Sequence, residues 1–213
     1  MTKFILVRHG KTFYDDVIKA GFSGHGLAFA PLSEEGIEEV EKTSKDLIFM
    51  DSDILISSPY TRAMQTASII SSRYQIPINV ELLLHEWIPD LSNKYNTVSE
   101  FTRNIHIAKD EYKRGKDDPN YHYNENIESL VHVRERALEV LSKYFDYDKV
   151  IVVTHGLLIN TLFDEDIRLK TGEYFVVDSD YLIRRFNLDN NKGKCLISFS
   201  FSSSNQSNSN ITC

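Results

Sequence analysis

Two histidine–glycine pairs stand at the ends of short apolar runs that are typical of buried strands. Arg8-His9-Gly10 follows the run at residues 4–7, and His155-Gly156 follows the run at residues 149–154. A neutral imidazole can act as a nucleophile or a general base, and the glycine after it permits close approach of a ligand. A single histidine in such a position is more often a structural residue, so neither pair predicts a site by itself. Because ligands of open α/β sheets bind beyond the carboxyl ends of the strands, we expect the two pairs to share one pocket.

A third candidate is an arginine near the start of a predicted helix, in the sequence Ser57-Ser-Pro-Tyr-Thr-Arg62. Backbone N–H groups and the helix dipole favour an anion at such a start, and the guanidinium adds a planar, permanent positive charge. The alternative is an arginine paired with a surface carboxylate. Glu86, which follows Leu82-Leu-Leu-His85, is informative only together with the other candidates, because acidic residues are common in loops.

Alternating strand and helix patterns must position these residues. Apolar, β-branched runs at 4–7, 53–57 and 149–154 predict short buried strands of a parallel sheet. The first predicted helix begins at Ser33, with Ile37, Val40 and Leu47 on one face, and the second begins at Ser58-Pro59 and runs to about Arg73. The third begins at Ser99 and stops at Gly115, with Phe101, Ile105, Ala108 and Tyr112 inward. The fourth begins at about Ile127 and runs to Tyr144. Together they predict an α/β fold, a three-layer α/β/α sandwich with a mostly parallel sheet.

The C-terminal part of the chain predicts an antiparallel edge to this sheet. Its strand-like runs are Tyr174–Val177, Tyr181–Phe186 and Cys195–Phe201, the last two separated by the turn Asn190-Asn-Lys-Gly193. Residues 203–213 are rich in Ser and Asn without periodicity, so we expect a frayed tail. The polar stretch 90–126, which holds the third helix, is expected to form a lobe over the site that sets substrate choice.

Length, composition and charge restrict the class of protein. The chain has 213 residues, of which 41% are hydrophobic and 26% charged, and its formal net charge is −7. The length predicts a single domain over residues 1–213, and the negative charge disfavours nucleic-acid binding but permits a cationic cleft for a small phosphorylated substrate. Apolar runs fall far short of the ~20 residues of a membrane span. With two cysteines and no signal-peptide pattern, we expect a cytoplasmic monomer or homodimer.

Four sequence blocks resemble, in the same order, those of the histidine phosphatase superfamily. The blocks are Leu6-Val-Arg-His-Gly-Lys-Thr12, Pro31-Leu-Ser-Glu-Glu-Gly36, Ser57-Ser-Pro-Tyr-Thr-Arg-Ala-Met-Gln-Thr-Ala67 and Val152-Val-Thr-His-Gly156. With Glu86 between the last two, the resemblance covers most of residues 3–160. It implies a phosphoglycerate-mutase-like fold and a phosphatase that hydrolyses a phosphomonoester.

The resemblance also implies roles for individual residues. His9 is the expected nucleophile, Arg8, Arg62 and His155 the expected phosphoryl ligands, and Glu86 the expected general acid and base. Flanking cations disfavour a protonated imidazole, which keeps a lone pair available for attack. Arginines can stabilise the phosphoryl oxygens where other enzymes use a metal, and the sequence has no HxH, HExxH or CxxC spacing. We therefore expect no metal and no cofactor.

Gly156 and Asp15 complete the expected substrate-binding set. Members of the family commonly have Asn a few residues after the nucleophile, behind an aromatic residue, where this chain has Phe13-Tyr14-Asp15. A carboxylate there repels a phosphate unless it is paired with a cation or turned away. The outer contacts of the phosphate pocket therefore depart from the family pattern.

Three functions would use such a site. The first is hydrolysis of a phosphomonoester through a phosphohistidine on His9. The second is a cofactor-dependent phosphoglycerate mutase, but the mutases carry a larger insertion before the second histidine than residues 87–154 allow. The third is a non-catalytic binder of phosphorylated ligands, which has no use for both an unprotonated nucleophile and an acid. The sequence leaves open which phosphomonoester is the substrate.

Overall fold

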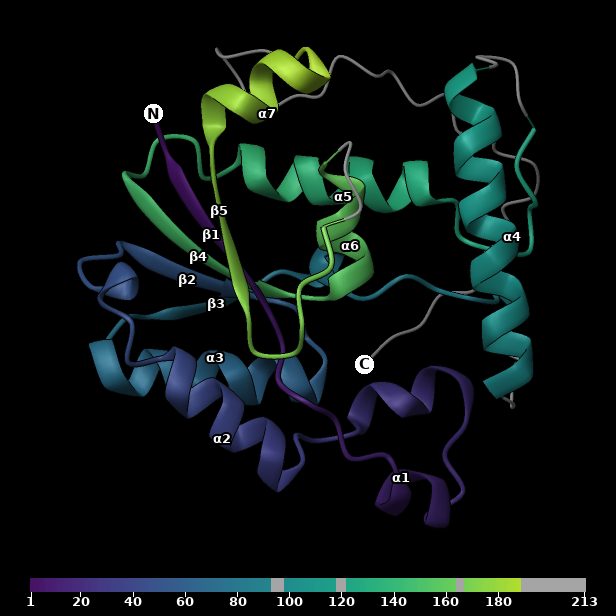
Figure 1. The fold of residues 1–213 in the computed structure, drawn as a ribbon, viewed down its shortest axis with the longest axis horizontal. Helices are drawn as coiled ribbons and strands as arrows, with labels where there is room; N and C mark the ends of the chain where they lie inside the picture. The colour runs from purple at the N-terminus through teal and green to yellow at the C-terminus, as the bar shows by residue number, and fades with distance from the viewer. Residues whose placement is uncertain (93–97, 118–121, 164–166, 189–213) are drawn as a thin grey trace, which may run out of the picture.

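The computed structural model describes residues 1–92, 98–117, 122–163 and 167–188, which form a five-stranded sheet flanked by helices (Figure 1). The strand order is β3-β2-β4-β1-β5. The strands are β1 (Lys3–Arg8), β2 (Ile54–Ser57), β3 (Ile78–Val80), β4 (Lys149–Thr154) and β5 (Tyr174–Asp178). All neighbouring pairs are parallel except β1 and β5, which are antiparallel. The predicted mostly parallel sheet with an antiparallel edge is therefore confirmed.

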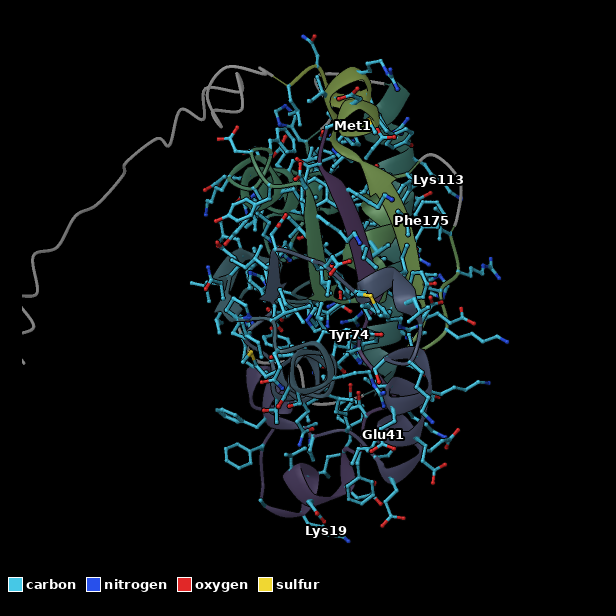
Figure 2. All side chains as sticks on the ribbon, turned by 90° about the vertical axis from the view of Figure 1, so that its left-hand side faces the viewer. Met1, Lys19, Glu41, Tyr74, Lys113 and Phe175 are labelled. Atoms are coloured by element: carbon cyan, nitrogen blue, oxygen red, sulfur yellow. The ribbon has the colours of Figure 1, made fainter. Side chains whose placement is uncertain are left out.

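The side chains of β1 alternate between two hydrophobic cores, one on each face of the sheet. Phe4 and Leu6 belong to the core that includes the buried residues of α5 (Leu130–Ser142) and α6 (Gly156–Thr161). Ile5 and Val7 belong to the core that includes the buried side chains of α2 (Glu34–Thr43) and α3 (Thr61–Tyr74). Figure 2, turned by 90°, shows Tyr74 of α3 and Glu41 of α2 in the layer below the sheet. This arrangement confirms the three-layer sandwich.

Capping side chains set the starts of several helices. The Ser33 hydroxyl accepts a hydrogen bond from the Gly36 N–H at the start of α2, as predicted, and Ser129 accepts one from His132 at the start of α5.

The remaining α-helices are α1 (Asp15–Lys19), α4 (Val98–Asp117) and α7 (Ser179–Phe186), and 3₁₀ turns cover Gly24–Phe29, Leu47–Phe49 and Leu82–Leu84. Helix α4 falls within the predicted lobe at 90–126, and Figure 1 shows it standing apart from α2 and α3, beside one end of the sheet.

The clearest error of the sequence interpretation is the strand predicted over Tyr181–Phe186, which lies in helix α7. The Asp178 carboxylate accepts a hydrogen bond from the Tyr181 N–H and caps the helix, and Asn187 ends it in the left-handed conformation. Leu182 is fully buried by this helix. The run Cys195–Phe201, the turn at 190–193 and the tail at 203–213 lie outside the described residues.

Other predicted boundaries are wrong by smaller margins. Helix α2 ends at Thr43, so Leu47 falls in a 3₁₀ turn capped by Asp46 and is 70% exposed, while Phe49 enters the core in its place. Helix α3 begins at Thr61 rather than at Ser58-Pro59. Helix α4 continues past Gly115 to Asp117, because a single glycine weakens a helix by only about 1 kcal/mol. Among the described residues, no helix is long and apolar enough to span a membrane.

Candidate active site

The carboxyl ends of adjacent parallel strands bring the two histidine–glycine pairs together. His9 follows β1 and His155 follows β4, and the His9 N–H donates to the Thr154 carbonyl over 3.1 Å. The two imidazole rings are 5.1 Å apart between centroids and meet edge to face. Both rings are buried, with exposed fractions of 6% for His9 and 0% for His155.

The hydrogen bonds of His9 leave a lone pair on Nε2. Nδ1 lies 2.8 Å from the Gly10 carbonyl oxygen, which can only accept, so this nitrogen carries the proton of the neutral ring. The Nε of Arg62 then donates to His9 Nε2 over 3.1 Å. Burial and the positive charges of Arg62 and Arg8 lower the pKa of His9 to about 3, although the Gly10 contact opposes this shift. The ring is neutral at physiological pH, with its basic nitrogen beside a guanidinium.

Arg62 lies in the first turn of α3, and only 6% of this residue is exposed to solvent. One terminal nitrogen lies 3.4 Å from His155 Nδ1, and the guanidinium carbon lies 5.0 Å from the centroid of the Tyr60 ring. The Thr66 hydroxyl donates to the Arg62 carbonyl and accepts from the Gly10 N–H. Thr66 therefore ties the start of α3 to the loop after β1, which fixes Arg62 relative to His9.

His155 is positioned from three sides. Its Nε2 lies 2.7 Å from the Ser58 hydroxyl, at the end of β2, and its ring meets that of Tyr60 edge to face at 5.2 Å. Its Nδ1 lies 3.8 Å from Glu86 Oε2. Burial, together with the charge of Arg62, lowers the pKa of His155 well below its usual value, so this ring too is neutral at physiological pH.

Glu86 lies beside His155 on the loop after the 3₁₀ turn Leu82–Leu84. Its Oε1 accepts a hydrogen bond from the Trp87 N–H over 2.9 Å, and 23% of its side chain remains exposed. Burial raises the pKa of Glu86 against the opposing effects of the Trp87 N–H and the nearby arginines. A carboxyl group that keeps its proton to a higher pH is suited to general acid catalysis.

Arg8 and Gly156 approach each other closely at the same edge of the sheet. A Cβ atom on Gly156 would lie 3.0 Å from Arg8 Nε, closer than ordinary van der Waals contact, so a larger residue there would require the Arg8 side chain to shift by a few tenths of an ångström. One terminal nitrogen of Arg8 donates to the Leu169 carbonyl over 2.6 Å. Its Nε is buried and has no hydrogen-bond partner among the described residues. Asp15, in contrast, begins α1 with an exposed side chain and, within the described residues, forms no hydrogen bond or ion pair with His9, Arg62 or Glu86.

Arg8, His9, Arg62, Glu86, His155 and Gly156 form one cluster. A cavity of about 410 Å³ lies beside this cluster. Its lining includes Arg8, Glu86 and Gly156 from the cluster, and Phe101, Ile105 and Lys109 from α4. Among the described residues, no three His, Cys, Asp or Glu side chains are grouped so that they could hold a metal ion.

The sequence interpretation missed a buried ion pair that holds the Glu86 loop. Arg136 of α5 donates to both carboxylate oxygens of Glu128, at 2.7 and 3.2 Å, and both side chains are 3% exposed. Arg136 also donates to the carbonyls of Leu83, His85 and Glu86. One sequence signal could have identified Arg136. It lies three residues after Val133 and one before Ala137, so it stands on the apolar face of a predicted helix. Ser58 was assigned only to a helix start and offered no such signal.

Removing Arg136 should destabilise the fold strongly. Arg136→Met leaves Glu128 buried without its partner, and we expect the free energy of unfolding to fall by about 3–5 kcal/mol. Urea denaturation measures this loss. The partly exposed pair of Lys143 with Glu81, at 3.4 Å, supplies the control, because the Lys143 side chain is 45% exposed and Lys143→Met should cost less than about 1 kcal/mol. Equal losses in the two variants would contradict a structural role for the buried pair.

The comparison with known families agrees with the geometry of this cluster. The family model of the histidine phosphatase superfamily (branch 1) matches residues 4–194. The chain belongs to this superfamily. The matched range includes His9, Arg62, Glu86 and His155.

Relatives within the histidine phosphatase superfamily are distant in sequence. An adenosylcobalamin/alpha-ribazole phosphatase of Escherichia coli is 24% identical over 162 residues, which cover 74% of this chain and 75% of the relative. An uncharacterized phosphatase, PhoE, of Bacillus subtilis is 27% identical over 165 residues, covering 78% and 77%. The solved structure of Bacillus stearothermophilus YhfR aligns with a TM-score of 0.63 at 23% identity, over 84% of this chain and 91% of that chain. The superfamily and its fold are therefore shown, as the sequence blocks predicted.

Proposed function

We propose that this protein is a phosphatase that hydrolyses a phosphomonoester through a phosphohistidine on His9. The observation that carries the proposal is the state of the His9 ring. Its proton is held on Nδ1 by the Gly10 carbonyl, and its Nε2 lone pair lies within 3.1 Å of Arg62. A buried, neutral imidazole beside a fixed cation is suited to attack on an anionic phosphoryl group.

In the first step, His9 Nε2 attacks phosphorus and the bond between phosphorus and the ester oxygen breaks. Glu86 donates its proton to the leaving alkoxide, which departs as an alcohol. Arg62 exchanges its hydrogen bond with Nε2 for bonds to phosphoryl oxygens, where it stabilises the charge of the transition state. The buried Nε of Arg8 gains an acceptor in the same way, which offsets the cost of leaving this donor without a partner.

In the second step, the Glu86 carboxylate accepts a proton from water, and the resulting hydroxide attacks the phosphohistidine. The bond between phosphorus and Nε2 breaks, the lone pair returns to Nε2, and inorganic phosphate leaves. The Ser58 hydroxyl donates to Nε2 of the neutral His155 ring, and the Nδ1–H of that ring exchanges its contact with Glu86 for a hydrogen bond to a phosphoryl oxygen. Glu86 and His9 thereby return to their starting protonation states.

Release of phosphate with water as the only acceptor tests the proposed function. The purified protein, incubated with a panel of phosphomonoesters and no added alcohol, should release inorganic phosphate in many turnovers per active site. Release of about one equivalent of the alcohol without inorganic phosphate, and transfer of the phosphoryl group only to an added hydroxyl compound, would instead support a mutase. Binding of the esters without any release would support a non-catalytic binder.

A further inference from the structure

The cavity beside the catalytic cluster is larger than a phosphoryl group needs. Its volume of about 410 Å³ lies within the range of about 300–1,000 Å³ that is usual for small-molecule sites. Arg8, Glu86 and Gly156 form one part of the lining. Arg8 precedes His9 in the chain and Gly156 follows His155, so this part adjoins the two reacting histidines. Helix α4, residues 167–169, Trp87, Leu157 and Asn160 line the remainder, so this part faces the alcohol portion of a substrate.

The part of the cavity beyond the phosphoryl group combines apolar side chains with the polar or charged side chains of Lys109, Asn160 and Arg168. The rings of Trp87 and Phe101 meet edge to face at 5.7 Å, and Phe101 is 41% exposed although it packs on a buried tryptophan. The other apolar lining residues are Ile105, Leu157, Ile167 and Leu169. An exposed aromatic ring in such a lining is stabilised when an apolar ligand group covers it.

Besides Arg8, Lys109 of α4 and Arg168 bring positive charge to this lining. The first basic residue of the helix, Arg103, contacts the Asn104 side chain over 3.4 Å, and Arg114 pairs with Asp110 over 2.6 Å. Lys109 lines the cavity and forms no hydrogen bond or ion pair within the described chain. Its ammonium group is therefore available to an anion of the ligand. Lys113, labelled in Figure 2, lies one turn further along α4 and is not part of the lining.

We propose that the substrate is a phosphomonoester whose alcohol carries an apolar body and a second anionic group, which Lys109 binds. The apolar body covers Phe101 and Ile105, and the second anion is a carboxylate or a second phosphate. Lys109 is a specificity residue in this proposal and takes no part in the chemical steps. The proposal rests on the phosphatase function proposed above.

Three synthetic esters with alike leaving groups test this proposal. They are benzyl phosphate, 4-carboxybenzyl phosphate and 4-(phosphonomethyl)benzyl phosphate, whose second anionic group is absent, a carboxylate or a phosphonate. The wild type should favour one or both anionic esters over benzyl phosphate by about fivefold in kcat/KM, the magnitude of a partly solvated ion pair. The preferred ester distinguishes a carboxylate from a phosphate-like anion. Benzyl phosphate should in turn exceed ethyl phosphate, because its ring covers apolar lining.

Lys109→Ala should remove the preference, mainly by raising KM for the anionic esters. Lys113→Ala, on the same helix and outside the lining, should retain the wild-type preference. Equal kcat/KM for all three benzyl esters in the wild type, or the same preference in Lys109→Ala, would overturn the proposal while phosphatase activity itself stands. Hydrolysis of none of the four esters would instead count against the phosphatase function.

Discussion

His9→Ala is expected to lower kcat/KM for any phosphomonoester by about 10⁴-fold or more, because no other group can take over the attack on phosphorus. The Nε2 lone pair lies beside Arg62, while His155 is occupied by Ser58 and Glu86. Inorganic phosphate release under substrate excess measures the loss. The expected residual activity reflects binding by the arginines alone.

A folded His9 variant is needed to interpret this loss. Circular dichroism and the melting temperature should show that His9→Ala remains folded, and His106→Ala, at an exposed position of α4, should keep wild-type turnover. Turnover of His9→Ala within tenfold of the wild type would contradict the role of His9 as nucleophile.

Glu86→Gln is expected to lower kcat/KM for alkyl phosphates by about 10²- to 10⁴-fold, the usual contribution of general acid catalysis. The loss for p-nitrophenyl phosphate should be much smaller, since that leaving group hardly needs a proton. Glu139→Gln, at an exposed position of α5, is the matched control. Equal losses for both substrates would indicate a different acid, with His85 and Asp15 the next candidates.

The pH profile gives a second measure of the role of Glu86. Burial raises the pKa of this carboxyl group, and its protonated form is the acid. For an alkyl phosphate, kcat/KM should therefore fall as the pH rises through that pKa, and Glu86→Gln should remove this alkaline limb. Protonation of His9 should not limit activity until the pH approaches its pKa of about 3.

The elements that the sequence predicted correctly are those with one dominant signal. The β-branched runs of β1, β2 and β4 are buried on both faces, as their continuous apolar pattern indicates. The run at 181–186 has apolar residues that suit either a strand or one face of a short helix, and the Asp178 cap decides for the helix. Strand β3 has only three residues, with Val80 54% exposed, and therefore no periodicity to detect.

The residues of the candidate site also differ in how far the sequence alone could predict their positions. His9, Arg62 and His155 stand at the ends of strands or at the start of a helix, so the parallel topology alone brings them to one edge of the sheet. The environment of Glu86 depends on Arg136, which is 50 residues away in sequence, and no local pattern encodes that contact. Likewise, Lys109 is distinguished from Lys113 only by the cavity that it lines.

Trapping the phosphorylated enzyme tests the central mechanism most directly. Glu86→Gln mixed with p-nitrophenyl phosphate should accumulate the intermediate, because the first step hardly needs the acid while the second lacks its base. After rapid quenching, the account predicts an acid-labile, alkali-stable phosphoryl group on the peptide that contains His9. A phosphoryl group on Ser57, Ser58 or His155 would contradict the account, as would turnover without any phosphorylated residue.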